Sequence, residues 1–227
     1  MGKLIDDLGY INAFLYVCAN MLRSLFGREL LFKYYLVVQP IRPLKLLSER
    51  RAKNYTVREI LAGDPLLDEF PRDRKVLDAR FDGRTSCFAV FHNDVLEGFM
   101  WVSRKFYDED EVKCRFRLDP EKEMVWDYDV YIFPKNRLSF AFPKLWQDVN
   151  QHLVDEGYKW TASRISAFNQ ESIRAHARLG GQIVGSVLFF VIGNFQIMLS
   201  SIPPRLHVGI SKNKVPVLNI HAPEQSC

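Results

Sequence analysis

The N-terminal segment repeats apolar residues at steps of three and four, a pattern that predicts one amphipathic helix. Residues 8–22 carry no charge, and this 15-residue run is shorter than the roughly 20 residues that span a bilayer. The helix therefore either packs on a domain or lies in a membrane interface, where the basic residues that follow would meet anionic headgroups. The residues of the apolar face are Ile11, Phe14, Leu15, Cys18, Met21, Leu22 and Leu25.

Segments rich in β-branched and aromatic residues predict several strands. They cover residues 34–38, 85–91, 95–103, 124–133, 160–167, 184–192 and 195–200. The connections at residues 92–94 and at Gly193-Asn194 are typical of hairpins. The charged stretch 104–123 is expected to be an exposed extension of the sheet or a loop.

Helix signals lie between these strands. Thr56 is expected to cap a helix over residues 57–61, and Asp64-Pro65 to open another over 66–70. Residues 142–156 have helical spacing, and Asn169 opens a helix that ends at Gly180-Gly181. This order predicts an α+β fold. We expect a mixed, mostly antiparallel sheet, flanking helices and a central parallel crossover from 124–133 through 142–156 to 160–167.

The predicted organisation has three parts. Residues 1–54 hold the amphipathic helix, the first strand and a basic connector, and residues 55–202 form the main domain. Residues 203–227, polar and containing prolines, are expected to be a tail without its own core.

Charge and cysteine content narrow the class of protein. The net charge of +4 is too small to indicate nucleic-acid binding, and it is concentrated in residues 1–58, with ten basic and four acidic side chains. Four widely spaced cysteines fit neither a disulfide framework nor a paired metal motif. Because the start of the chain does not read as a signal peptide, we expect a cytoplasmic protein.

Several activities lack their sequence signatures. The chain has no GxSxG, P-loop, HExxH or GxGxxG motif, and its five histidines share no ligand spacing. The acidic run 108–111 is read as a solvated loop rather than a cation site. No metal site is predicted.

A strand, a proline and a short loop precede the 142–156 helix. Such a unit aims backbone N–H groups and the helix dipole at one point, which suits a pyrophosphate. The loop reads Asn136-x-x-Ser139-x-Ala141; a register that starts at Arg137 fits less well, because it puts Phe140 and Phe142 at the positions of small residues. The alternative is an ordinary helix start.

These residues, together with Asn169-x-x-Ser172-Ile173-x-x-His176-x-x-Leu179-Gly180 and the final hairpin, resemble the GNAT superfamily of N-acyltransferases over about residues 55–202. The family loop reads Gln/Arg-x-x-Gly-x-Gly/Ala, so Ser139 and Ala141 stand in the glycine positions. The resemblance implies a wedge between the strands ending at Pro134 and Ala167 that admits a coenzyme A thioester. The residues it implies for cofactor binding are Tyr131, Ile132, Phe133, Asn136, Arg137, Leu138, Ser139, Phe140, Ala141 and Asn169.

The resemblance also implies a catalytic acid at His176, where the family often has a tyrosine, although a lone helical histidine is more often structural. The base that deprotonates the amine is expected to be Asp129 or water, with Asp127 and Glu97 as further candidates. Strand alternation places Asp127, Asp129 and Tyr131 on one face. Alternatively, these acids pair with arginines 115 and 117.

The sequence therefore predicts an N-acyltransferase that moves an acyl group from acetyl-CoA or another acyl-CoA to an unnamed amine. An acyl-carrier protein docked on the basic connector is an alternative donor. The alternative function is a non-catalytic GNAT-like module on a membrane surface or a protein partner, with peripheral membrane contact through residues 8–33.

Overall fold

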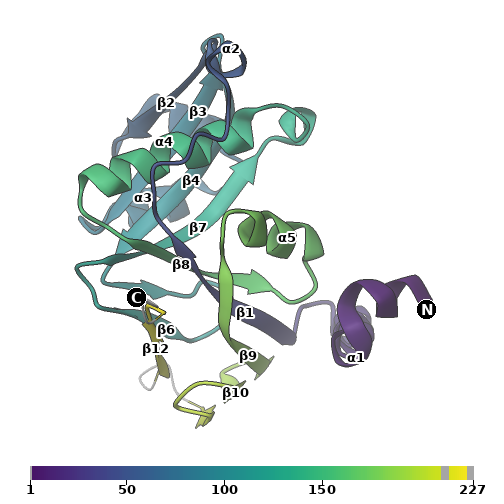
Figure 1. Ribbon diagram of the computed structural model, residues 1–227. Helices are drawn as coiled ribbons and strands as arrows, with labels where there is room; N and C mark the ends of the chain where they lie inside the picture. The colour runs from purple at the N-terminus through teal and green to yellow at the C-terminus, as the bar shows by residue number, and fades with distance from the viewer. Residues whose placement is uncertain (1, 211–214, 224–227) are drawn as a thin grey trace. The chain divides into compact units, whose positions relative to one another are not determined.

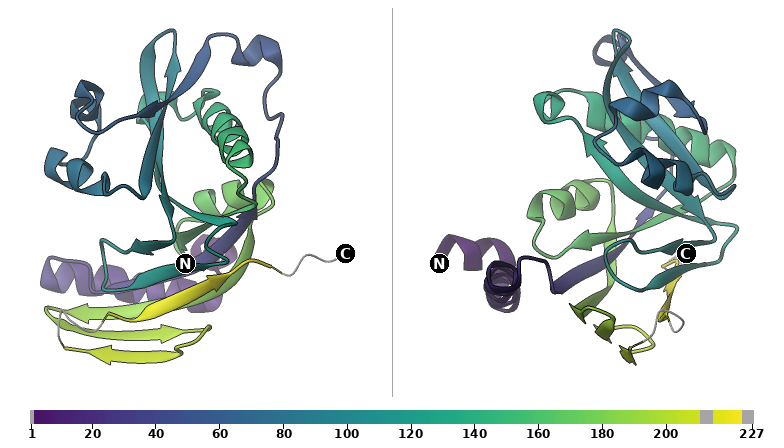
Figure 2. Two further views of the ribbon diagram at one scale, coloured as in Figure 1. Left: turned by 90° about the vertical axis from the view of Figure 1, so that its left-hand side faces the viewer. Right: turned by 180° about the vertical axis from the view of Figure 1, so that it is seen from behind.

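The computed structural model describes residues 2–210 and 215–223, and for residues 2 and 3 the backbone alone. Backbone contacts divide the chain into two compact units, whose segments are drawn in Figures 1 and 2. The first unit comprises Met1–Pro40, Phe106–Pro120 and Ala162–Cys227, and the second comprises Ile41–Lys105 and Glu121–Thr161. The three sequence segments predicted above stay a prediction.

The first unit contains strands in the order β11-β10-β9-β1-β8, with β8 included from Ala162 onward. β1 pairs antiparallel with β9, and β10 pairs antiparallel with both β9 and β11. The predicted final hairpin is confirmed, and Gly193 supplies the positive φ of 58° that its turn needs. The bounds are β1 (Leu31–Pro40), β8 (Trp160–Ser166), β9 (Gln182–Ile192), β10 (Phe195–Ser200) and β11 (Leu206–Gly209).

A second, three-stranded sheet of the first unit corrects two expectations. β5 (Phe106–Asp108) pairs antiparallel with β6 (Arg115–Asp119), and β12 (Val217–His221) joins β6 in parallel. The charged stretch 104–123 is therefore neither a plain loop nor wholly exposed, since Phe116 and Leu118 are fully buried. In the expected tail, β11 and β12 form, and Leu218 and Ile220 are buried because they alternate inward along β12.

Two helices complete the first unit. α1 (Gly2–Phe26) bends at Gly9, where φ is 74°, and packs beside β1, with Asn12 Nδ2 donating to Tyr35 Oη at 2.8 Å. α5 (Gln170–Arg178) begins as predicted, because Asn169 Oδ1 caps the Ser172 N–H at 3.0 Å. In the described part of the chain, no helix is both long and apolar enough to cross a bilayer.

The apolar face predicted for α1 is divided: Leu15, Cys18 and Leu22 are partly buried, and its other four residues are exposed. Ile11, Phe14, Met21 and Leu25 are 55–72% exposed, whereas Ala13 and Ala19 are buried.

The second unit contains the antiparallel order β7-β4-β3-β2. β2 (Tyr55–Ile60) overturns the helix expected at residues 57–61, because Thr56 and Val57 are β-branched and the segment pairs along its whole length with β3. The other strands are β3 (Thr85–His92), β4 (Val95–Arg104) and β7 (Met124–Ile132), and the helices are α2 (Glu49–Ala52), η1 (Pro65–Glu69), α3 (Arg74–Arg80), η2 (Pro134–Asn136) and α4 (Ala141–Asp155).

Helices cover both faces of this sheet, as the left view of Figure 2 shows. η1 and α3 cover an apolar cluster that includes Leu67, Phe70, Leu77, Phe99 and Trp101. α4 packs against β2, β3 and β4 with its buried side, Leu145, Trp146, Val149 and Leu153. The predicted α+β class with a mixed, mostly antiparallel sheet is confirmed.

A bulge in β7 changes which side chains share a face. Phe99 pairs with Tyr131 and Trp101 with Tyr128, so β7 has one extra residue there, and Asp129 has a φ of 47°. Tyr128 and Tyr131 consequently both pack on the cluster under α3. The predicted shared face of Asp127 and Asp129 is wrong, because the bulge interrupts the alternation between them.

Candidate functional site

The loop between β7 and α4 is held by one buried carboxylate. Glu97 on β4 is 5% exposed; its Oε1 accepts from Asn136 Nδ2 at 2.7 Å and its Oε2 accepts from Ser139 Oγ at 2.8 Å. His92 Nδ1 lies 3.5 Å from Glu97 Oε1. Glu97 is therefore an anchor of the loop rather than a free base, and it fixes both polar residues of the GNAT-like motif.

Three backbone amides of this loop, those of residues 139–141, have partners within the chain. Ser139 N donates to Asn136 O at 2.9 Å, and Ala141 N donates to Ser139 Oγ at 3.1 Å. Phe140 N lies 3.3 Å from the Tyr55 hydroxyl, which accepts from it. Ser139 Oγ therefore occupies the Ala141 N–H where the family loop has a glycine, and a phosphate that binds these three amides would have to displace their partners.

Beside the capped loop lies a cavity of about 840 Å³, which we call the Phe140 pocket. Its wall carries three basic side chains and no acidic one. The Arg51 guanidinium lies over the Phe140 ring, 5.2 Å from its centroid. The lining residues are Ser48, Arg50, Arg51, Asn54, Tyr55, His92, Ser139 and Phe140.

The other residues predicted for cofactor binding differ in exposure. Arg137 and Leu138 are exposed, whereas Tyr131, Ile132 and Phe133 are partly buried. Phe133 N donates to Glu97 O at 2.9 Å, so that amide is used by the sheet. Their contact with a pantetheine arm stays a prediction.

Asp129, the predicted base, is tied to two arginines. Arg72 donates to its Oδ1 at 2.5 Å, and Arg80 donates to its Oδ2 at 2.6 Å. Both guanidinium groups lie over aromatic rings, Arg72 over Tyr131 and Arg80 over Trp101. The expected pairing of Asp129 with Arg115 is wrong, because Arg115 pairs with Asp108 at 2.6 Å.

His176, the predicted acid, is buried in the first unit. It is 6% exposed, and burial lowers the pKa of its imidazole to about 4. It is therefore neutral at pH 7, and the imidazolium expected to protonate a thiolate is absent at that pH. His176 and Asn169 belong to the first unit and the loop to the second, so their assembly into one site stays a prediction.

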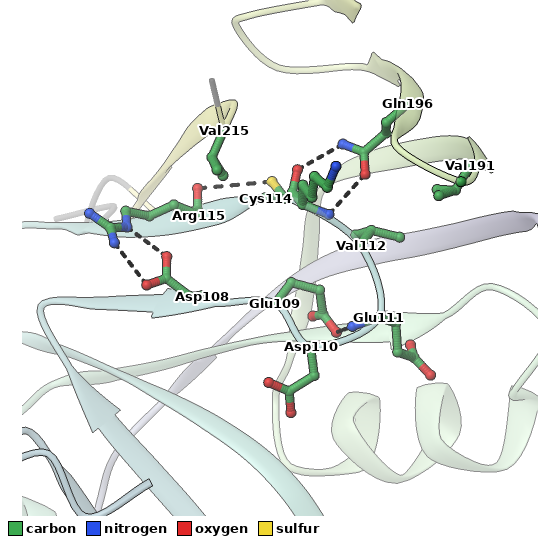
Figure 3. A pocket seen from close by; sticks show the side chains of 12 residues that line it. Asp108, Glu109, Asp110, Glu111, Val112, Cys114, Arg115, Val191, Gln196 and Val215 are labelled. Atoms are coloured by element: carbon green, nitrogen blue, oxygen red, sulfur yellow. Dashed lines mark hydrogen bonds and ion pairs between the residues drawn. The ribbon is translucent and has the colours of Figure 1, made fainter. Parts of the chain in front are cut away.

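Of the acidic run 108–111, Glu109 is buried and the other three acids are exposed; the run lines a cavity of about 440 Å³ in the first unit (Figure 3). Glu109 accepts two hydrogen bonds from Arg164, at 2.7 and 2.8 Å, and Glu111 accepts one from Tyr34 Oη at 2.6 Å. Burial raises the pKa of Glu109 even against the neighbouring guanidinium. Glu109 and Glu111 thus form hydrogen bonds that stabilise the first unit. Among the described residues, no group of three or more His, Cys, Asp or Glu side chains could hold a metal ion.

Comparisons with known proteins return solved structures only. No family model and no curated protein matches the sequence. The chain is similar to a functionally unknown conserved protein from Staphylococcus epidermidis (12% identity, 78% of this chain, 68% of that chain, TM-score 0.48). It is also similar to a tandem GNAT protein from the clavulanic acid biosynthesis pathway (14% identity, 72% of this chain, 55% of that chain, TM-score 0.47). A third similar structure is a GNAT family acetyltransferase from Elizabethkingia anophelis with acetyl-CoA bound (13% identity, 55% of this chain, 74% of that chain, TM-score 0.41). Two of these structures thus belong to the family that the sequence motifs resemble.

Sequence analysis missed Arg50, Arg51, Tyr55 and His92. The basic character of the connector was visible, but Arg50 and Arg51 precede the GNAT-like region, Tyr55 precedes the helix expected after Thr56, and His92 lies in the expected hairpin connection 92–94. Their convergence depends on the antiparallel pairing of Tyr55 with His92 across β2 and β3.

Proposed function

We propose that the chain is a GNAT-type N-acyltransferase that uses an acyl-CoA as donor. The observation that supports this proposal is the β7–loop–α4 unit, in which Glu97 holds Asn136 and Ser139 in one geometry. A loop fixed by a buried carboxylate is preorganised, so binding a donor there would lose little conformational entropy.

The reaction needs few groups from the protein. The amine nitrogen attacks the thioester carbonyl, the C–N bond forms, the C–S bond breaks, and the ammonium proton leaves as the thiol gains one. Because Asp129 is doubly ion-paired and His176 is neutral and buried, water carries these protons in our proposal. The protein would act mainly by holding donor and amine together.

The test is thiol release from acetyl-CoA and from longer acyl-CoAs, measured against a panel of primary amines and acyl-carrier protein thioesters. We expect amine-dependent release, together with a thermal shift of several degrees on CoA binding. A chain that neither releases thiol nor shifts at millimolar CoA is not a CoA-dependent transferase.

A second candidate is a non-catalytic module that rests on a membrane surface. The observation that favours it is the outer face of α1, where Tyr10, Phe14 and Leu25 are 80%, 67% and 70% exposed. An apolar ridge with Arg23 and Arg28 near its C-terminal end suits the boundary between headgroups and acyl chains of an anionic bilayer.

Sedimentation with vesicles tests this candidate. The chain should co-sediment with vesicles containing phosphatidylserine, and Phe14→Ser with Met21→Ser should abolish the binding. Val95→Ser, which removes an apolar side chain that is 55% exposed at the β3–β4 turn, is the matched control. Self-association without vesicle binding would instead identify the ridge as a contact between copies.

A further inference from the structure

We propose that β11 is an edge through which two copies of the chain pair, strand to strand, about a two-fold axis at Val208. The partner is a second copy of this chain. The inference does not rest on the proposed acyl transfer, because it uses only the outer edge of the sheet in the first unit.

The outer side of β11 is free within the described part of the chain. β11 is the last strand in the order β11-β10-β9-β1-β8, and it pairs with β10 alone. Ser200 N donates to Arg205 O at 2.9 Å, so these two residues form a hydrogen-bonded pair of the ladder. Because such pairs alternate along antiparallel strands, the backbone N–H and C=O groups of Leu206, Val208 and Ile210 point away from β10.

The sequence of this edge does not block a further strand. Natural edge strands often carry a lysine, a proline or a bulge that prevents pairing with another chain. Residues 206–210 contain neither lysine nor proline, and the register between β10 and β11 is regular. The outward backbone groups are therefore available to a strand from outside.

The side chains at this edge form an exposed apolar row. Leu206, Val208 and Ile210 alternate along the chain and are 60%, 55% and 73% exposed. Leu199, the cross-strand neighbour of Leu206, is 49% exposed on the same face. Pairing with another apolar strand would remove part of this row from water, which favours association.

A second copy fits the edge because the segment is complementary to itself. An antiparallel pair centred on Val208 places Val208 opposite Val208 of the second copy and Leu206 opposite Ile210 of the second copy. This register joins the three residues whose backbone groups point outward, and it keeps the apolar rows of both copies on one face. Such an isologous contact closes as a dimer.

The size of the contact sets the expected affinity. Pairing over residues 206–210 would bury on the order of 1,000 Å² in total, which is near the lower limit for a specific interface. We therefore expect a dimer that dissociates in the micromolar range.

Sedimentation equilibrium of the full chain, from micromolar to submillimolar concentration, tests the proposal. Val208→Lys should weaken the dimer about tenfold, because two like charges would lie opposite each other at the axis. Ile192→Lys is the matched control: it adds the same charge at a 45% exposed position of β9, an inner strand, and should leave the dimer unchanged. Circular dichroism and the melting temperature check that each variant is folded.

Disulfide formation tests the register. Under mild oxidation, a mixture of Leu206→Cys and Ile210→Cys chains should form a covalent dimer, because these two positions lie opposite each other across the axis. Neither variant alone should exceed the background that the native cysteines give in the unaltered chain.

Four outcomes would overturn the proposal. The first is a chain that stays monomeric over the whole concentration range, and the second is a dimer that Val208→Lys leaves unchanged. Loss of the dimer in Ile192→Lys would show that sheet faces associate rather than edges. Loss in Phe14→Ser with Met21→Ser would instead place the contact on α1.

Discussion

Glu97 Oε1 accepts a hydrogen bond from Asn136 Nδ2 at 2.7 Å, although the two residues are 39 positions apart in the chain. The bond joins the start of β4 to the loop before α4. The same carboxylate accepts from Ser139, so one buried side chain sets the conformation of the motif by which the sequence resembles an acyltransferase.

Replacing this carboxylate should loosen the loop. Glu97→Ala leaves the Asn136 amide and the Ser139 hydroxyl without their acceptor, and we expect the free energy of unfolding to fall by about 2 kcal/mol. Urea denaturation measures the change. Glu49→Ala, which removes an exposed carboxylate paired with Lys45, should change stability by less than about 0.5 kcal/mol. An equal effect of the two substitutions would show that Glu97 is not an anchor.

Two substitutions of Asp129 distinguish a structural role of this residue from a role as general base. Asp129→Ala leaves Arg72 and Arg80 without a carboxylate and disfavours the positive φ of 47°, so the free energy of unfolding should fall by about 3 kcal/mol. Asp129→Asn tolerates that backbone conformation, and turnover per folded molecule should stay within about twofold if water carries the proton. A loss of about 100-fold at unchanged melting temperature would identify Asp129 as the base.

Burial of His176 makes the stability of the protein depend on pH. The unfolded imidazole binds a proton near pH 6.5, whereas the folded one does so only near pH 4, where its pKa lies. Between these values the unfolded state binds more protons, so the free energy of unfolding falls as the pH falls, by about 3 kcal/mol in total. In His176→Leu this contribution should be absent when urea denaturation is compared at pH 7 and pH 4.5. Equal pH dependence in both proteins would contradict a buried neutral His176.

Arg164 should be essential to the first unit. Its guanidinium pairs with Glu109, whose side chain is fully buried, so Arg164→Met would leave that carboxylate uncompensated. We expect the free energy of unfolding to fall by about 3–5 kcal/mol. Glu111→Gln keeps an oxygen for Tyr34 at a half-exposed position and should cost less than about 1 kcal/mol. Comparable losses in the two variants would argue against the buried pair.

Local chemistry made most elements predictable. Asn169 caps α5, Gly193 closes the last hairpin, and the spacing of Leu145 and Val149 identifies the buried side of α4. Each signal lies within a few residues of the structure it specifies. The prediction of a helix after Thr56 was wrong, because pairing with β3 determines the strand conformation of that segment. No local sequence pattern indicates which strand a segment will pair with.

The sequence by itself determined the fold class, the strand–loop–helix order and the positions of the GNAT-like residues, because periodicity and capping are local properties of a chain. Only the tertiary structure determined the ion pairs, the burial and the hydrogen bonds of those residues. It placed Asp129 between two arginines, buried His176, occupied the loop amides with Tyr55 and Ser139, and gathered Arg51 and His92 at one cavity. These outcomes depend on contacts between residues far apart in the chain, and a bulge of one residue in β7 was enough to change a predicted face.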